Sequence, residues 1–266
     1  MENSFNNKLK NICNRKNSRL CIGLDIDPEK LPKTSDKSLQ GLESFAKDVI
    51  DATIDFCPVY KPNMAFYERF GSQGYALVER LVDHIAGRSI TIADAKRGDI
   101  GNTTKQYAKA VFNTIGFDAI TVAPYMGRDS IIPFIEDETK GAFVLCLTSN
   151  KSAEDLQYKT SNGTTIYEDV ANLVLELNEN DNLGLVVGAT KTEQMQSLRE
   201  QTANLSWLIP GIGAQGGSLE ESISIGNQNG VGIINVSRGI LYAGDGSLNA
   251  IVESAQNYTK QIREVL

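Results

Sequence analysis

The chain has 266 residues, 41% of them hydrophobic, which suits one large domain with a substantial buried core. Its 26 basic and 33 acidic residues give a net charge of -7, so general attraction to nucleic acid or to an anionic membrane is disfavoured. No apolar run suits a membrane span or a signal peptide, and the four cysteines form neither a CxxC metal pattern nor a dense disulfide framework. We therefore expect a cytoplasmic protein in which an anionic ligand would need a locally basic pocket.

Short apolar runs alternate with longer amphipathic segments along the chain. Several runs are nearly continuous in Val, Ile, Leu and Ala, as expected of parallel strands that are covered on both faces. The eight predicted strands are residues 19–25, 57–64, 89–94, 118–124, 141–148, 183–189, 206–211 and 231–237. Between them, segments such as 41–56 and 248–262 repeat apolar residues at helical spacing.

A strand followed by a helix eight times predicts an α/β fold, the (β/α)8 TIM barrel, formed as a single domain over residues 1–266 with an extra N-terminal helix. A doubly wound open sheet is the alternative fold, but no GxGxxG motif follows the first strand. One polar connection, residues 149–170, is longer than the others and is predicted to form a loop over the barrel mouth.

Polar and charged residues stand where several predicted strands end. Asp25 closes the first strand, Lys61 lies in the second, and the fifth ends at Ser149. The third runs into DAKRGD, in which Asp94 and Lys96 are two residues apart, so on an extended segment their side chains leave on the same face. A salt-bridged strand end would explain this pair alone. Active sites of barrels lie at this end of the strands, however, so the convergence of these groups predicts a site.

Asp99 follows in the loop after the third predicted strand. It lies between Gly98 and Gly101, and a helix is expected to begin near Asn102 or Thr103, both of which are reasonable N-caps.

Glycine-rich turns follow the seventh and eighth predicted strands. PGIGAQGG at 210–217 and NVSRGI at 235–240 supply backbone amide donors and Arg238 at the place where barrels often hold phosphate. An arginine can bind two phosphate oxygens at once, so we predict a phosphate site here.

The only histidine, His84, lies near the end of a predicted helix, so serine or cysteine triads have no plausible base. A metal site would have to consist of oxygen ligands, and a lysine between the acids argues against one. We therefore expect no metal and no cofactor. A phosphorylated small molecule remains, with Lys96 as proton donor, because an ammonium held between carboxylates stays protonated at neutral pH.

These motifs make the chain resemble the orotidine 5′-phosphate decarboxylase family, and most closely its longer bacterial branch. DAKRGDIGNT matches the D-x-K-x-x-D-I-G-x-T signature of that family. LDIDP, YKPNMAFYE, TSN, PGIGAQGG and NVSRGI match in the same order, and together the motifs span residues 23 to 240. The resemblance implies decarboxylation of orotidine 5′-phosphate to UMP and CO2, the final step of de novo pyrimidine nucleotide synthesis, without a metal or cofactor.

The resemblance also implies catalytic roles. Lys96 would deliver the proton to C6 of the pyrimidine, Asp94 would face the departing carboxylate, and Lys61 would complete a row of alternating charge. Asp99 and Thr103 would reach the active site of the other subunit of a homodimer.

Further residues would bind the substrate. By the same resemblance, Asp25 would hold the ribose, Ser149 the edge of the pyrimidine, and Pro210 the wall of the base pocket. Gln215 and Arg238 would bind the phosphate.

Two other functions stay open on the sequence alone. A sugar-phosphate decarboxylase or an aldolase-like synthase of the same barrel superfamily can share the D-x-K-x-x-D core, but it uses magnesium, so metal dependence of turnover would identify it. A non-catalytic barrel would bind a phosphorylated ligand such as UMP without turning over orotidine 5′-phosphate.

Overall fold

The structure is a computed structural model that describes residues 3–212 and 216–266. Within these residues, eight parallel strands close into a barrel in the order β1-β10-β9-β8-β5-β4-β3-β2. The barrel strands are β1 (Leu20–Gly23), β2 (Val59–Lys61), β3 (Ile90–Arg97), β4 (Ala119–Val122), β5 (Gly141–Leu147), β8 (Leu183–Val187), β9 (Ser206–Ile209) and β10 (Gly232–Val236). Each of the eight predicted runs contributes one of these strands, so the predicted TIM barrel is confirmed.

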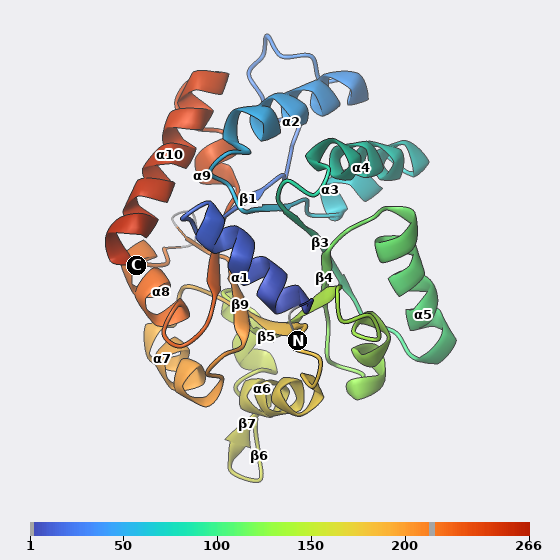
Figure 1. The fold of residues 1–266 in the computed structure, drawn as a ribbon, viewed down its shortest axis with the longest axis vertical. Coiled ribbons are helices and arrows are strands. Elements are labelled where there is room, and N and C mark those ends of the chain that lie inside the picture. The colour runs from blue at the N-terminus through green and yellow to red at the C-terminus, as the bar shows by residue number, and fades with distance from the viewer. Residues whose placement is uncertain (1–2, 213–215) are drawn as a thin grey trace.

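Helices surround the barrel on its outside (Figure 1). The α-helices are α1 (Phe5–Arg15), α2 (Leu39–Thr53), α3 (Ala65–Glu68), α4 (Ser72–Ile85), α5 (Gly101–Lys109), α6 (Ile166–Leu177), α7 (Thr192–Gln201), α8 (Leu219–Gly226), α9 (Arg238–Leu241) and α10 (Leu248–Val265). Other helical segments are the π-helix η1 (Ala110–Thr114), which continues α5, and the 3₁₀ segments η2 (Arg128–Ser130), η3 (Ile132–Phe134) and η4 (Lys151–Asp155). In the described part of the chain, none of these helices is both long and apolar enough to cross a membrane.

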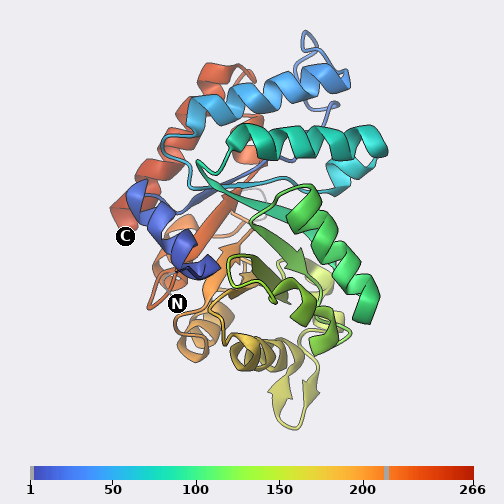
Figure 2. The ribbon, with the colours of Figure 1, turned by 45° about the vertical axis from the view of Figure 1, so that its right-hand side comes forward.

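Two connections differ from the predicted pattern. After β4 the chain forms only the 3₁₀ turns η2 and η3, because Pro124, Gly127 and Pro133 interrupt any longer helix. The predicted loop at 149–170 is also only partly a loop. It holds η4 and a hairpin of β6 (Thr160–Ser161) and β7 (Thr164–Thr165), which projects from the body in Figure 2, and its last residues already belong to α6.

The predicted N-terminal helix, α1, lies across one end of the barrel (Figure 1). Its residues Phe5 and Leu9 are 1% and 0% exposed and pack with inward-facing side chains of the strands. The ring of Phe5 meets that of Phe143 edge-on, with centroids 5.9 Å apart. A Cβ atom at Gly141 would overlap the Phe5 ring, so glycine is required there. Helix α1 therefore closes the end of the barrel where the strands begin.

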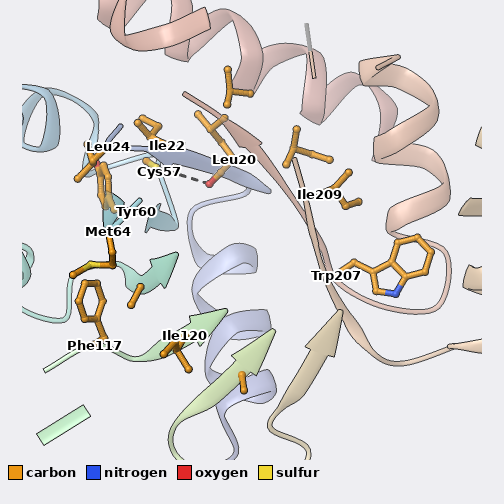
Figure 3. Close-up of a cluster of buried hydrophobic side chains, with 14 of the residues drawn as sticks. Leu20, Ile22, Leu24, Cys57, Tyr60, Met64, Phe117, Ile120, Trp207 and Ile209 are labelled. Carbon is orange, nitrogen blue, oxygen red and sulfur yellow. Dashed lines mark hydrogen bonds between the residues drawn. The ribbon is translucent and has the colours of Figure 1, made fainter. Parts of the chain in front are cut away.

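A second apolar layer fills the space between the strands and the surrounding helices, and Figure 3 shows part of it. The Tyr60 hydroxyl lies 2.7 Å from Thr53 Oγ1 and donates to the carbonyl of Ile50, so its polar end is satisfied inside this layer. The Arg199 guanidinium stacks on Trp207, 3.8 Å from the ring centroid. These contacts hold β2 against α2 and β9 against α7.

All four cysteines lie in the described part of the chain, and each is a free, buried thiol. Burial raises the pKa of Cys13 to about 12 and that of Cys57 to about 11. Burial also raises the pKa of Cys21 and Cys146 above the ordinary value for a thiol. The thiols are therefore protonated and serve as small apolar groups of the core.

Candidate active site

A cavity of about 380 Å³ opens where the barrel strands end. Five residues predicted for the site line it together: Asp25, Lys61, Asp94, Pro210 and Arg238. They come from β2, from β3 and from the segments after β1, β9 and β10, which are far apart in sequence. Closure of the barrel brings them to one mouth.

Asp94 lies between two lysines. Its Oδ2 atom is 2.8 Å from Lys61 Nζ and its Oδ1 atom is 2.5 Å from Lys96 Nζ. The Lys61 side chain is 4% exposed and that of Asp94 is 12% exposed, whereas the Lys96 side chain is 48% exposed. The row therefore runs from a buried ammonium through a carboxylate to an ammonium at the solvent-accessible end.

Lys61 and Asp94 each stabilise the charged form of the other. Burial raises the pKa of Asp94, but the ammonium groups of Lys61 and Lys96 outweigh this and hold the pKa well below its usual value. Burial lowers the pKa of Lys61, but the carboxylates of Asp94 and Asp25 outweigh that effect and hold the pKa above its usual value. Asp94 and Lys61 are therefore both charged at neutral pH.

The segment that carries Asp94 and Lys96 is less regular than the predicted extended strand. The pairing of β3 with β4 shifts register between Ala93 and Arg97. Lys96 has a left-handed backbone with φ of 48°. On the side of β3 that faces β2, the backbone N–H of Asp94 donates to the carbonyl of Pro62 at 3.0 Å. The two side chains do meet, as expected, but a bulge rather than a regular strand brings them together.

Asp25 places a buried, unsatisfied acceptor at the mouth. Its Oδ1 atom has no hydrogen-bond partner among the described residues. Nearby, the Tyr242 hydroxyl donates to the Asp25 carbonyl at 2.9 Å and accepts from the backbone N–H of Asp27 at 2.7 Å. The loop after β1 is thus held in place, while the Asp25 carboxylate keeps capacity for a donor on a ligand.

The sequence pattern did not single out five further polar residues of the cavity lining: Lys30, Asn63, Asn235, Ser237 and Tyr242. Tyr242 lies four residues after Arg238, about one helical turn away. Asn235 is 9% exposed and accepts from Cys21 Sγ at 3.5 Å. A polar residue inside the otherwise apolar run VGIINV was the available signal for Asn235, because buried amides need partners.

The predicted phosphate loop is described only in part. Arg238 begins α9 and is exposed, and Pro210 lies across the same cavity. Gln215 lies outside the described residues. Ser149 follows β5 and packs against Gly188, where an added Cβ atom would lie 2.7 Å from Ser149 N. Ser149 is not among the described residues that line the cavity.

Asp99 and Thr103 are also not among the described residues that line this cavity. The Asp99 carboxylate accepts from the backbone N–H of Ile100 at 2.8 Å, and Thr103 is exposed on α5. The predicted N-cap was wrong, because α5 begins at Gly101 and Ile100 is its N-cap. Gly101 takes a positive φ of 54°, so the chain turns into the helix before Asn102 and Thr103.

A closed parallel barrel with a charged cavity at the carboxyl ends of its strands defines a TIM-barrel enzyme. Residues 18–251 match the model of the Orotidine 5'-phosphate decarboxylase / HUMPS family. The chain is 46% identical over 268 residues to the orotidine 5'-phosphate decarboxylase of Dehalococcoides mccartyi (strain CBDB1), covering 98% of this chain and 97% of that protein. It is 44% identical to the enzyme of that name from Christiangramia forsetii, covering 91% of this chain and 90% of that protein. The chain belongs to the orotidine 5′-phosphate decarboxylase family.

Solved structures show the same similarity. The structure of Leishmania donovani OMP decarboxylase superposes with a TM-score of 0.86 at 35% identity and covers 98% of both chains. That of Leishmania donovani UMP synthase gives a TM-score of 0.88 at 37% identity, covering 98% of this chain and 56% of that chain.

Proposed function

We infer that this chain decarboxylates orotidine 5′-phosphate to UMP and CO2 in pyrimidine nucleotide synthesis. The observation that carries the inference is the Lys61–Asp94–Lys96 row at the mouth of a barrel of this family. The family match over residues 18–251 supports the substrate, and the row supplies the chemistry.

Decarboxylation breaks the bond between C6 of the pyrimidine and the carboxyl carbon. The electron pair stays on C6 in the plane of the ring, where the π system cannot delocalise it, so fixed charges must stabilise it as it develops. The Lys96 ammonium does this and then delivers its proton to C6. Asp94 repels the substrate carboxylate in the ground state, and this repulsion is relieved as neutral CO2 leaves.

Other residues hold the substrate in this proposal. Asp25 accepts from the ribose hydroxyls, which would satisfy its buried Oδ1 atom. Arg238 binds the phosphate together with Gln215, Pro210 forms a wall of the base pocket, and Ser149 faces the pyrimidine edge. Binding of the distant phosphate helps to orient the ring against the lysine.

The direct test is Lys96→Ala. We expect turnover of orotidine 5′-phosphate to fall by about 1000-fold or more, with the fold and UMP binding retained, because both the proton and the stabilising charge are lost. Absorbance of the nucleotide follows the reaction and calorimetry follows UMP binding. Lys260→Ala is the control, because Lys260 is an exposed lysine on α10 with a side chain 74% exposed.

Near-normal turnover in Lys96→Ala would contradict the proposed role. The same assay with and without EDTA distinguishes the alternatives. Loss of activity with EDTA favours the magnesium-dependent synthase, and UMP binding without any turnover by the unmodified chain favours a non-catalytic barrel.

We further propose that two copies of the chain form a homodimer with shared active sites. Asp99 and Thr103 lie next to exposed apolar side chains. Ile100 is 54% exposed, and Tyr125 and Met126, just before η2, are 84% and 46% exposed. Helix α5 contacts η2 and η3, so these residues belong to one region of the surface. A second copy that covers this region would receive Asp99 in its own cavity.

A further inference from the structure

The bulge in β3 places a single residue of β4 opposite residues 94–96, which include Asp94 and Lys96. Ala93 pairs with Ile120 and Arg97 pairs with Val122, so β3 advances four residues while β4 advances two. Thr121 is the residue between the two partners on β4. The backbone from Asp94 to Lys96 therefore cannot follow a regular ladder of hydrogen bonds with β4.

The Thr121 hydroxyl bonds to both members of the catalytic pair. Its Oγ1 atom accepts from the backbone N–H of Lys96 at 3.0 Å and donates to Asp94 Oδ1 at 3.0 Å. An ionised carboxylate can only accept, so the single hydroxyl hydrogen points to Asp94 and a lone pair remains for the Lys96 N–H. Thr121 is 1% exposed, which keeps water from replacing either bond.

These bonds matter because Lys96 has an unfavourable backbone conformation. A left-handed φ of 48° is uncommon for a residue other than glycine and persists only where the surroundings hold it. Thr121 holds the backbone N–H of Lys96, and Asp94 holds its Nζ atom. The same hydroxyl also fixes the Asp94 oxygen that receives this ammonium.

We propose that Thr121 is a positioning residue for the decarboxylation. Its hydroxyl sets the geometry of Lys96 relative to Asp94, and so the approach of the ammonium to the reacting carbon. Thr121 is buried and its hydroxyl is bonded to Lys96 and Asp94, so it acts through these two residues and not on the substrate. The inference rests on the roles proposed above for Asp94 and Lys96.

Thr91 offers a matched control on the neighbouring strand. Its Oγ1 atom donates to Asp118 Oδ2 at 3.0 Å and accepts from the backbone N–H of Asp118 at 3.1 Å. It is 3% exposed and lies near the start of β3, away from the mouth of the barrel. Thr91→Val thus removes the same kind of paired hydrogen bonds from the opposite end of the barrel.

The experiment compares kcat, KM, UMP affinity and thermal stability for Thr121→Val, Thr121→Ser and Thr91→Val. We expect Thr121→Val to lower kcat by about 10- to 100-fold, because misplacement of a catalytic group by a fraction of an ångström is costly, while UMP affinity changes by less than about threefold. Thr121→Ser restores the hydroxyl and should keep kcat within about threefold of the wild type. Thr91→Val should lower stability and leave kcat unchanged.

The inference is overturned if Thr121→Val keeps wild-type kcat, if Thr91→Val loses kcat equally, or if the serine variant is no better than the valine variant. Should Thr121→Val fail to fold, Thr121→Ala takes its place with the same expectation. Lys96→Ala separates the two proposals. If that variant is active, the proposed catalytic role is wrong; if it is inactive and Thr121→Val is fully active, only the positioning role fails.

Discussion

Asp94 keeps its charge in a place where burial favours a neutral carboxyl. Burial raises the pKa of Asp94, but Lys61 and Lys96 hold it below the usual value. A carboxyl with a lower pKa in the folded than in the unfolded state contributes stability above its unfolded pKa of about 3.9, and this contribution is lost as the pH falls through the folded pKa. The charge of Asp94 therefore stabilises the fold throughout the neutral range.

Replacement of Lys61 should show how far this lysine lowers the pKa of Asp94. We expect Lys61→Met to lower the free energy of unfolding at pH 7 by about 3 kcal/mol, because a buried carboxylate loses one of its two cations. The pKa of Asp94 should rise in the variant, so the loss of stability below about pH 4 should be smaller than in the wild type. Urea unfolding at several pH values measures both effects.

Lys260→Met is the control for this measurement, because its partner Glu264 is 3.8 Å away and both side chains are mostly exposed. Parallel stability curves for the wild type and Lys61→Met across the acid range would show that Lys61 does not set the pKa of Asp94.

Among single elements, α1 is the one at which a substitution should change stability without changing activity. It lies at the end of the barrel opposite the cavity and buries Phe5 against Phe143. We expect Phe5→Ala to lower the free energy of unfolding by about 3–5 kcal/mol, as is usual for a buried phenylalanine, with kcat unchanged in the fraction that stays folded. Urea unfolding and the decarboxylase assay at low temperature measure the two quantities.

Asn11→Ala, at an exposed position on the same helix, should change neither quantity by much. A Phe5→Ala variant of normal stability but low kcat would mean that α1 influences the site directly.

Strand β3 also shows what the sequence could and could not predict. The apolar run predicted the strand, and its charged end predicted the pairing of Asp94 with Lys96, which is confirmed. The proposed positioning role of Thr121 depends on the register between β3 and β4, and no local sequence pattern predicts that register. The missing helix after β4 had local signals in Pro124 and Pro133, but the expected eightfold repeat outweighed them.

At the scale of the whole molecule, a chain of net charge -7 carries a row of two ammonium groups around one carboxylate at the mouth of its barrel. This local excess of positive charge suits an anionic nucleotide despite the net negative charge of the chain. Asp99 and Thr103 are not among the described residues that line the cavity of a single chain. Their proposed role therefore depends on a second copy, and the shared-site dimer stays a prediction.

Mixed dimers test that prediction. Lys96→Ala and Asp99→Ala chains should each be nearly inactive alone. When they are mixed equally and exchange at random, half the dimers are mixed and each of these has one intact site, so roughly one quarter of wild-type activity should return.

Native mass spectrometry of differently tagged chains verifies the exchange. Two Lys96→Ala preparations with different tags serve as the control and should regain nothing. If exchange is complete and activity stays at the level of the separate variants, Asp99 acts within its own chain.

The four buried thiols have a practical consequence for following the motions of the molecule. Because they are protonated and inaccessible, a chromogenic disulfide reagent can modify them only when part of the barrel opens. The rate of colour formation therefore reports how often the native chain opens, without denaturant. We expect UMP to bind only the unopened barrel, so it should slow this labelling in proportion to its saturation. Immediate modification of any thiol in the native chain would show rapid local opening of the structure near that cysteine.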